Sequence, residues 1–264
     1  MAKLNGVFFS DLLKRSVHFT AVLSNDNTFI NPDDPYYKRP VKNVYLLHGY
    51  CGVDTDWADG APLGEIANRF NVNFFMPSGE NSFYLDRPET GGKYAHFVGE
   101  EFVEYTRKTF GLSNKREDTI IGGLSMGGFG ALHTALMFNE TFSKTIALSS
   151  ALIHNEVITM RPEDGGNSVA NYEYYSLMFG NPAELKNSVN NPEVLVKNII
   201  ANKGIMPDIY MAIGTEDFLL QPNRDMKAFL ESQNVKFTYE EGPGVHDMNF
   251  WRVYLVKGLE WALQ

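Results

Sequence analysis

The sequence predicts an α/β protein whose mainly parallel central sheet is covered by helices on both faces. The 264-residue chain has the usual length of one large α/β domain, and such a chain buries most of its unfolded surface. Short apolar runs alternate with helical patterns through its middle, as in parallel strands joined by helices. One strand-to-helix junction, around Ser125, is also rich in glycine.

The first predicted elements are three strands and a loop. Ser16–Leu23 alternates apolar and polar residues, as a half-buried strand does, and Asn25–Pro40 is rich in the turn-forming residues Asn, Asp and Pro. The runs Asn43–Leu47 and Val72–Met76 are short and almost wholly apolar. We therefore expect both runs to be buried strands of a parallel sheet.

The middle of the chain alternates helix and strand. Tyr94–Phe110 carries side chains at helical spacing and is followed by Gly111, a common helix stop. Thr119–Gly122 predicts a central strand, and Met126–Phe138 predicts a helix with a glycine-rich first turn. Phe142–Leu148 predicts the next strand of the same sheet.

The regular pattern stops between Ser149 and Lys203, where Asn, Glu, Tyr and Met are frequent and no strand is evident. We interpret residues 150–205 as a cap insertion of short helices and loops, within a single domain spanning residues 1–264. Regular patterns return after this segment. Asp208–Ile213 predicts a strand and Pro222–Ser232 a helix; Val235–Tyr239 predicts a second strand, and about His246–Leu263 a last helix.

Charge and cysteine content exclude several classes of protein. The formal net charge of −9 disfavours nucleic acid and anionic membranes as partners. Cys51 is the single cysteine, so no intramolecular disulfide or thiolate metal cluster can form, and we expect it to be a small buried packing residue. The apolar run Val7–Phe9 is too short for a signal peptide, and no stretch reaches a membrane span of roughly 20 residues. We therefore expect a cytoplasmic protein. Whether it forms a homo-oligomer stays open.

Two patterns that resemble ligand motifs are discounted. The acidic segment 54–59 is faintly similar to a calcium loop, but Ala58 stands at its fifth position and the turn glycine is displaced to Gly60. The glycines around Ser125 do not match a dinucleotide fingerprint, because the serine lies within the turn. We therefore expect neither a bound metal nor a cofactor.

The strongest local signal is the G-x-S-x-G motif formed by residues 123–127, with Ser125 at its centre. It follows a predicted strand and opens a predicted helix, which is the context that a nucleophile elbow requires. A serine on such a sharp turn has strained backbone angles, and its hydroxyl projects clear of the sheet. The helix N-terminus behind it favours developing negative charge. We predict Ser125 to be a nucleophile.

A serine nucleophile needs a neighbouring base, and the usual chain order in this kind of site is serine, acid, histidine. Three histidines follow Ser125. His133 lies two turns along the same helix and should point away, and His154 lies in the irregular insertion. His246 lies in a flexible loop directly after the last strand. We therefore predict His246 to be the base.

The acid should lie on a loop after a strand between the serine and the histidine. Asp217 follows the Asp208–Ile213 strand, with Glu216 as its competitor, while Asp225 falls within a predicted helix. The predicted role of Asp217 is to fix the tautomer of the base and to stabilise its protonated form.

An oxyanion intermediate needs two backbone donors. We predict the N–H groups of Met126, after the nucleophile, and of Tyr50, after an early strand. We interpret His48 as structural. The aromatic residues Trp57 and Phe83, with Tyr84, are candidates to line the substrate site, and core packing stays open for each.

Five segments together resemble the esterase D-like branch of the α/β-hydrolases, most nearly the bacterial tributyrin esterases that act on short acyl chains. They run through most of the chain in family order: YLLHGYCGVDTDW (45–57), SFYLDRPETGGKYAHFVGEEFVEYTRKTF (82–110), GGLSMGGFGA (122–131), GTEDFLL (214–220) and GVHDMNFWR (244–252). This family is also similar to feruloyl and acetylxylan esterases, S-formylglutathione hydrolases and mycolyltransferases.

The resemblance implies an α/β-hydrolase fold and cofactor-free hydrolysis of a small-molecule ester through an acyl-enzyme on Ser125. It carries over Asp217, His246 and the amides of Tyr50 and Met126, and it implies that the 150–205 insertion shapes the acyl pocket. Three alternatives stay open: a feruloyl or acetylxylan-type esterase, a thioesterase similar to S-formylglutathione hydrolase, and a hydrolase-fold binding protein without chemistry.

Overall fold

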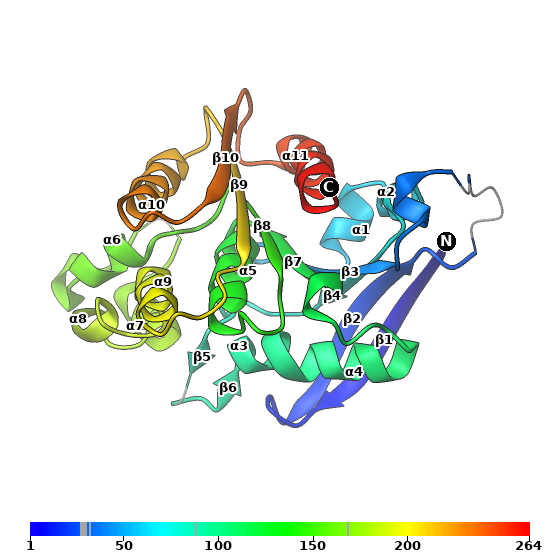
Figure 1. Ribbon diagram of the computed structural model, residues 1–264. Coiled ribbons are helices and arrows are strands. Elements are labelled where there is room, and N and C mark those ends of the chain that lie inside the picture. Colours follow the sequence, from blue (N-terminus) through cyan, green and yellow to red (C-terminus); the bar gives the residue numbers. More distant parts are fainter. Residues whose placement is uncertain (27–30, 32, 88, 168) are drawn as a thin grey trace.

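A central sheet of eight strands runs through the molecule, with helices on either side (Figure 1). The computed structural model describes residues 1–26, 31, 33–87, 89–167 and 169–264. The strands are β1 (Ala2–Ser10), β2 (Arg15–Leu23), β3 (Lys42–Leu47), β4 (Val72–Pro77), β7 (Thr119–Leu124), β8 (Lys144–Leu148), β9 (Asp208–Gly214) and β10 (Phe237–Gly242). Their spatial order is β1-β2-β4-β3-β7-β8-β9-β10, parallel from β4 to β10 and antiparallel at β1–β2 and β2–β4. The predicted α/β class with a mainly parallel sheet is confirmed.

Helices cover both faces of the sheet, and each face has its own apolar core (Figure 1). The alternation of side chains along β3 shows why, since Val44 and Leu46 face one core while Tyr45 and Leu47 face the other. One face carries α1 (Asp56–Gly60), α2 (Leu63–Phe70) and α11 (Met248–Ala262); the other carries α3 (Tyr94–His96), α4 (Phe102–Phe110), α5 (Met126–Met137) and α10 (Leu220–Ser232).

The helix predicted over Tyr94–Phe110 is present, but it is not uniform. A π-helical turn, Phe97–Glu101, separates α3 from α4. The helix ends at Gly111, whose φ of +64° lies in the left-handed region that favours glycine. A two-stranded hairpin, β5 (Asp86–Arg87) with β6 (Gly92–Lys93), precedes it.

The connection from β8 to β9 consists of short helices, in agreement with the irregular pattern of its sequence. They are α6 (His154–Thr159), α7 (Tyr172–Phe179), α8 (Pro182–Leu185) and α9 (Pro192–Ala201). The asparagines of this segment mark helix starts, because Asn171, Asn181 and Asn191 each cap the N-terminus of one helix through the side chain. We call the segment from Ser149 to Pro207 the cap; it lies beside α5 and α10 (Figure 1).

Several predicted boundaries shift, and β1, β5 and β6 were not predicted. β1 is an edge strand with one face exposed along its length and the other buried only near its end, so its sequence lacks the clear alternation of a half-buried strand. The strand predicted from Val235 begins at Phe237 and extends to Gly242. Of the predicted loop Asn25–Pro40, residues 27–30 and 32 lie outside the described residues, and Pro35–Tyr37 forms a 3₁₀ turn.

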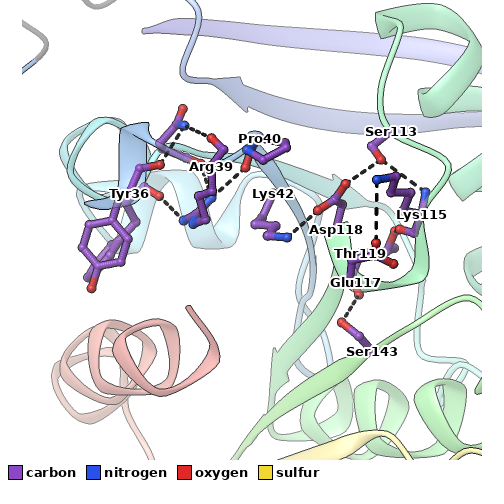
Figure 2. Close-up of polar contacts among 12 residues, drawn as sticks. Tyr36, Arg39, Pro40, Lys42, Ser113, Lys115, Glu117, Asp118, Thr119 and Ser143 are labelled. Atoms are coloured by element: carbon purple, nitrogen blue, oxygen red, sulfur yellow. Dashed lines mark hydrogen bonds and ion pairs between the residues drawn. The ribbon is translucent and has the colours of Figure 1, made fainter. Parts of the chain in front are cut away.

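A polar network closes the amino ends of the central strands (Figure 2). The buried carboxylate of Asp118 pairs with Lys42 at the start of β3 and accepts a hydrogen bond from the Ser113 hydroxyl at 2.6 Å. The Thr119 hydroxyl donates to the Lys115 carbonyl at 3.0 Å. These contacts join the starts of the strands to one another. The loops that follow the parallel strands lie at the opposite edge of the sheet.

Within the described residues, no helix combines the length and the apolar content that crossing a bilayer requires.

Candidate active site

The predicted functional residues meet at the carboxyl ends of the parallel strands. Ser125 follows β7, Asp217 lies in the loop after β9 and His246 lies in the loop after β10, while Tyr50 follows β3. Because the strands are parallel, all four loops emerge at one edge of the sheet. Residues separated by more than a hundred positions are therefore neighbours.

Ser125 occupies the sharp turn that its motif predicts. Its φ of 54° and ψ of −119° are strained for a residue with a side chain, and its N–H donates to the Leu148 carbonyl at 2.9 Å. The flanking glycines are required by space. A Cβ on Gly123 would lie 2.2 Å from the Gly127 carbonyl oxygen, and a Cβ on Gly127 would lie 2.3 Å from that of Leu47. The turn can close only with glycine at both positions.

A hydrogen-bonded chain joins the serine, the histidine and the aspartate. His246 Nε2 lies 2.9 Å from Ser125 Oγ, and its Nδ1 lies 2.9 and 3.0 Å from the two carboxylate oxygens of Asp217. An ionised carboxylate only accepts, so Nδ1 carries the proton and Nε2 is free to accept from the serine hydroxyl. This is the tautomer that a general base requires.

The carboxylate of Asp217 is buried but stabilised as an anion. Burial by itself favours the neutral acid, but hydrogen bonds from His246 and from the Leu219 amide outweigh it, and the pKa of Asp217 lies below its ordinary value. The Asp217 carboxylate is therefore ionised at neutral pH.

The competing acids occupy other positions. Glu216 Oε2 accepts the Gly244 N–H at 2.8 Å, so this side chain braces the loop that carries His246. Asp225 lies in α10 and accepts from Gln221 at 2.7 Å.

The other two histidines after the serine also point elsewhere. His133 is buried on α5 and its Nε2 lies 2.9 Å from the Val189 carbonyl of the cap, while burial lowers its pKa to about 4. His154 is buried against Glu193, with Nε2 3.4 Å from the carboxylate.

The two predicted amide donors lie beside Ser125, and neither has an acceptor among the described residues. Met126 is the first residue of α5, where helical N–H groups lack intrahelical partners. Within the described residues, the N–H of Tyr50 makes no hydrogen bond to another protein group. A Cβ on Gly49 would lie 3.5 Å from Ser125 Cβ, so the Tyr50 loop directly adjoins the nucleophile.

The peptide group that carries the Tyr50 N–H is held at its other end. The Gly49 carbonyl lies 2.8 Å from His48 Nδ1 and accepts the Gly52 N–H at 3.1 Å. Since C=O and N–H point in opposite directions across a trans peptide, these two bonds direct the Tyr50 N–H away from them. His48 Nε2 accepts the Gly79 N–H at 2.8 Å, so His48 has the structural position expected from the sequence.

Two aromatic side chains that the sequence interpretation missed contact His246. The Phe218 ring lies 4.6 Å from the imidazole and is 71% exposed, while the Trp251 ring meets it at 4.9 Å and 90°. Each stands within five residues of a triad position, but only the folded loops bring both rings to the imidazole.

Two cavities open on either side of Ser125 and His246, and Tyr50 lines both. The cap-side cavity has a volume of about 470 Å³, and its walls include Phe83, Met126, Ala151, Ile153, Tyr175 and Leu219. The second cavity, about 460 Å³, is lined by Asp56, Asp59, Gly60, Met248 and Trp251, and we call it the α1–α11 cavity.

Three sequence expectations about this region need correction. Trp57 is 1% exposed and donates to the Leu47 carbonyl at 3.0 Å, and Tyr84 is fully buried and donates to the His48 carbonyl at 3.1 Å. Neither lines either cavity, whereas Phe83 does. Cys51 is exposed rather than buried, because it occupies a left-handed turn with φ of 61° at the tip of the Tyr50 loop.

Comparison with known proteins places this geometry in a family. Residues 26–262 match the Esterase family, described as "Putative esterase". An acetyl esterase of Caldicellulosiruptor saccharolyticus is 43% identical over 99% of this chain and 98% of its own length.

Two solved structures from Staphylococcus aureus are similar over the whole of this chain. The fluorophosphonate-binding serine hydrolase FphF is 26% identical, with a TM-score of 0.84 over 98% of its own length. The S-formylglutathione hydrolase FrmB is 27% identical, with a TM-score of 0.83 over 99% of its own length. A ferulic acid esterase at 21% identity shares the fold with a TM-score of 0.76, covering 99% of this chain and 97% of its own. The chain therefore belongs to the esterase family, has the α/β-hydrolase fold and is a carboxylic ester hydrolase.

Proposed function

We propose that the chain is a serine carboxylesterase that hydrolyses esters of short acyl groups through an acyl-enzyme on Ser125. The hydrogen-bonded chain from Ser125 through His246 to Asp217, open to a cavity on each side, carries this proposal. The name of the acetyl esterase at 43% identity supports a short acyl group.

The proposed first step is attack of Ser125 Oγ on the ester carbonyl. His246 Nε2 takes the hydroxyl proton, and the amides of Tyr50 and Met126 donate to the oxyanion. The alcohol then leaves with the proton from His246, and the acyl group stays on Ser125. Water, deprotonated by the same imidazole, releases the acid in the second half of the cycle. Asp217 holds the imidazole and stabilises its charged form.

The cap-side cavity is the proposed acyl pocket. Its lining is mostly apolar: Met126, Ala151 and Leu219 are buried, and the cap contributes Ile153 and Tyr175 together with the polar residues Glu156 and Asn167. Apolar walls favour an acyl chain over a charged group. The cap side chains would thus set the acyl length, in agreement with the role that the family resemblance implies for this segment.

The α1–α11 cavity is the proposed site of the alcohol. It contains the carboxylates of Asp56 and Asp59, and Asp59 is compensated by an exposed contact with Lys3 at 3.2 Å. Uncompensated carboxylates disfavour an anionic leaving group by charge repulsion. This cavity therefore suits neutral alcohols.

A glutathione thioesterase is the second candidate, since FrmB is 27% identical over the whole chain. Glutathione carries a net negative charge at neutral pH, and the carboxylate of Asp56, which has no ion pair within the described residues, opposes it in this site. Relative kcat/KM for S-formylglutathione and for a neutral acetyl ester separates the two candidates. We expect the neutral ester to have the higher kcat/KM, and Asp56→Asn to narrow the ratio between the two kcat/KM values.

A panel of p-nitrophenyl esters from acetyl to octanoyl tests the main proposal. We expect kcat/KM to be highest from acetyl to butyryl, and Ser125→Ala to lower kcat by about 10⁵-fold or more. A fluorophosphonate probe should label the unaltered protein at Ser125 and leave Ser125→Ala unlabelled. Full turnover by Ser125→Ala would refute the acyl-enzyme, and a maximum at octanoyl would refute the short-chain preference.

A further inference from the structure

The loop from Gly79 to Tyr84, between β4 and β5, lies against the loop that carries the Tyr50 amide, and we call it the clamp. It contains three residues other than glycine in the left-handed region: Glu80, Phe83 and Tyr84, with φ of 50°, 52° and 54°. Such strain persists only where the surroundings hold it, and it gathers at functional sites.

The clamp contacts the Tyr50 loop on both sides of the donor peptide. On one side, the Gly79 N–H fixes His48, which in turn lies against the Gly49 carbonyl. On the other side, Asn81 Oδ1 accepts the N–H of Cys51 at 2.6 Å. The Asn81 amide also points at Cys51 Sγ, 3.8 Å away. Cys51 itself is left-handed, with φ of 61°, so the bond to Asn81 holds a strained turn.

The cap reaches the same loop through one tyrosine. Tyr174 of α7 donates its hydroxyl to the Asn81 carbonyl at 2.5 Å, and its ring meets the Tyr50 ring at 5.9 Å and 82°. The Tyr50 ring also lies 6.5 Å from Phe83 of the clamp. Asn81 therefore bonds the oxyanion loop through its side chain and the cap through its backbone.

The clamp is anchored away from the cap as well. Glu80 forms an ion pair with Arg15 of β2 at 2.7 Å and accepts a hydrogen bond from Tyr94. Ser82 Oγ donates to the Gly79 carbonyl at 2.6 Å. One end of the clamp is thereby tied to the sheet, while Asn81 contacts both the cap and the Cys51 turn.

We infer that Asn81 is a positioning residue for the Tyr50 donor of the oxyanion hole, and that Tyr174 couples this donor to the cap. Neither side chain is placed to transfer a proton, so both act through the Cys51 turn. The inference rests on the proposed function. Loss of one such donor costs about 100- to 1,000-fold in turnover, and its misplacement costs part of that.

The test compares Asn81→Ala and Tyr174→Phe with matched controls. Asn31→Ala removes another asparagine that accepts a backbone N–H, and Tyr37→Phe removes another tyrosine hydroxyl bonded to an asparagine carbonyl; both residues lie between β2 and β3, outside the cap and the clamp. The readouts are kcat and KM on p-nitrophenyl acetate, and Ki for trifluoroacetone. Ser125 adds to that ketone, His246 takes the proton, and the carbonyl oxygen becomes an oxyanion in the hole.

For Asn81→Ala we expect kcat to fall about 10- to 100-fold, KM to change less than about threefold, and Ki to rise by the factor that kcat/KM falls. Tyr174→Phe should lower kcat and raise Ki by about 3- to 10-fold each. Both controls should have the kcat, KM and Ki of the unaltered protein. A kcat within twofold for Asn81→Ala, or an unchanged Ki despite a lower kcat, overturns the inference. If Asn81→Ala does not fold, Tyr174→Phe provides the test: a kcat within twofold of the unaltered protein, or an unchanged Ki despite a lower kcat, then overturns the inference.

Turnover and fluorophosphonate labelling of the unaltered protein are measured first. Their absence would refute the proposed function. Their presence, together with an unaffected Asn81→Ala, would refute the positioning role alone.

Discussion

The two ends of the parallel sheet each hold a buried carboxylate, and only one of them has the geometry of an active site. At the amino ends, Asp118 pairs with Lys42 and accepts from Ser113 (Figure 2). At the carboxyl ends, Asp217 pairs with His246 and accepts from the Leu219 amide. In both places burial opposes the charge, hydrogen bonds outweigh it, and the carboxyl pKa is lowered.

The difference lies in where each chain of hydrogen bonds ends. From Asp118 it runs to Ser113, whose Oγ also accepts the backbone N–H of Lys115, so the network closes on the protein. From Asp217 it runs through His246 to the strained Ser125, which lines two cavities and lies beside two amides that have no acceptor in the described part of the chain. A buried charge pair alone therefore does not indicate catalysis; it does so when it ends at a reactive group that a substrate can reach.

The largest expected effect that sharpens this comparison is on Asp217. Asp217→Asn keeps the shape of the side chain but favours the wrong imidazole tautomer, so kcat should fall about 10⁴-fold. The thermal midpoint should change little, because the amide oxygen can still accept from Leu219. Glu216→Gln is the matched control and should stay within a few fold of the unaltered rate. Equal losses in the two variants would contradict the assignment of the acid.

Asp118→Ala should lower stability while leaving the turnover rate nearly unchanged. Lys42 would lose its partner in a largely buried place, so the free energy of unfolding should fall by roughly 2–4 kcal/mol in urea titrations. Below the unfolding transition, kcat on p-nitrophenyl acetate should stay within twofold. A large loss of kcat in the folded variant would break the separation between the two ends.

The cap should change specificity without changing chemistry. Ile153 lines the cap-side cavity, so Ile153→Ala should raise the ratio of kcat/KM for octanoyl over acetyl esters by about tenfold. Ile158→Ala removes a comparable cap side chain that packs against the core but is not among the residues lining either cavity. Its acyl profile should match the unaltered protein, and a shift in this control would assign the effect to general loosening of the cap.

The smallest expected effect is on the pH dependence of stability, through His133 of α5, which contacts the Val189 carbonyl of the cap. The folded-state pKa of His133, about 4, is below that of an unfolded histidine, about 6.5, so between these values the unfolded chain binds more protons. Stability should therefore fall as pH drops from 6.5 towards 4. His133→Gln should flatten that slope by at most about 1.4 kcal/mol per pH unit in urea titrations. An unchanged slope would refute this assignment.

Much of the fold followed from local patterns. The strands β3, β4 and β7 were predictable from short buried runs, and the end of α4 from the glycine at position 111, because both signals depend on a few neighbouring residues. Edge strand β1 was not, since its exposure removes the alternation that identifies a strand. Trp57 and Tyr84 were misassigned as candidates for the substrate site because an aromatic residue near a motif has the same sequence signature in a core and in a pocket.

The sequence by itself determined the elbow around Ser125, the parallel class of the sheet and the order in which serine, acid and base follow one another. Those depend on sterics and periodicity within a few residues. Only the tertiary structure decided that Asp217 rather than Glu216 reaches the imidazole, that Phe218 and Trp251 contact it, and that Asn81 joins the oxyanion loop to the cap. Such contacts join loops from different strands, and their distances are set by how the strands pair in the sheet.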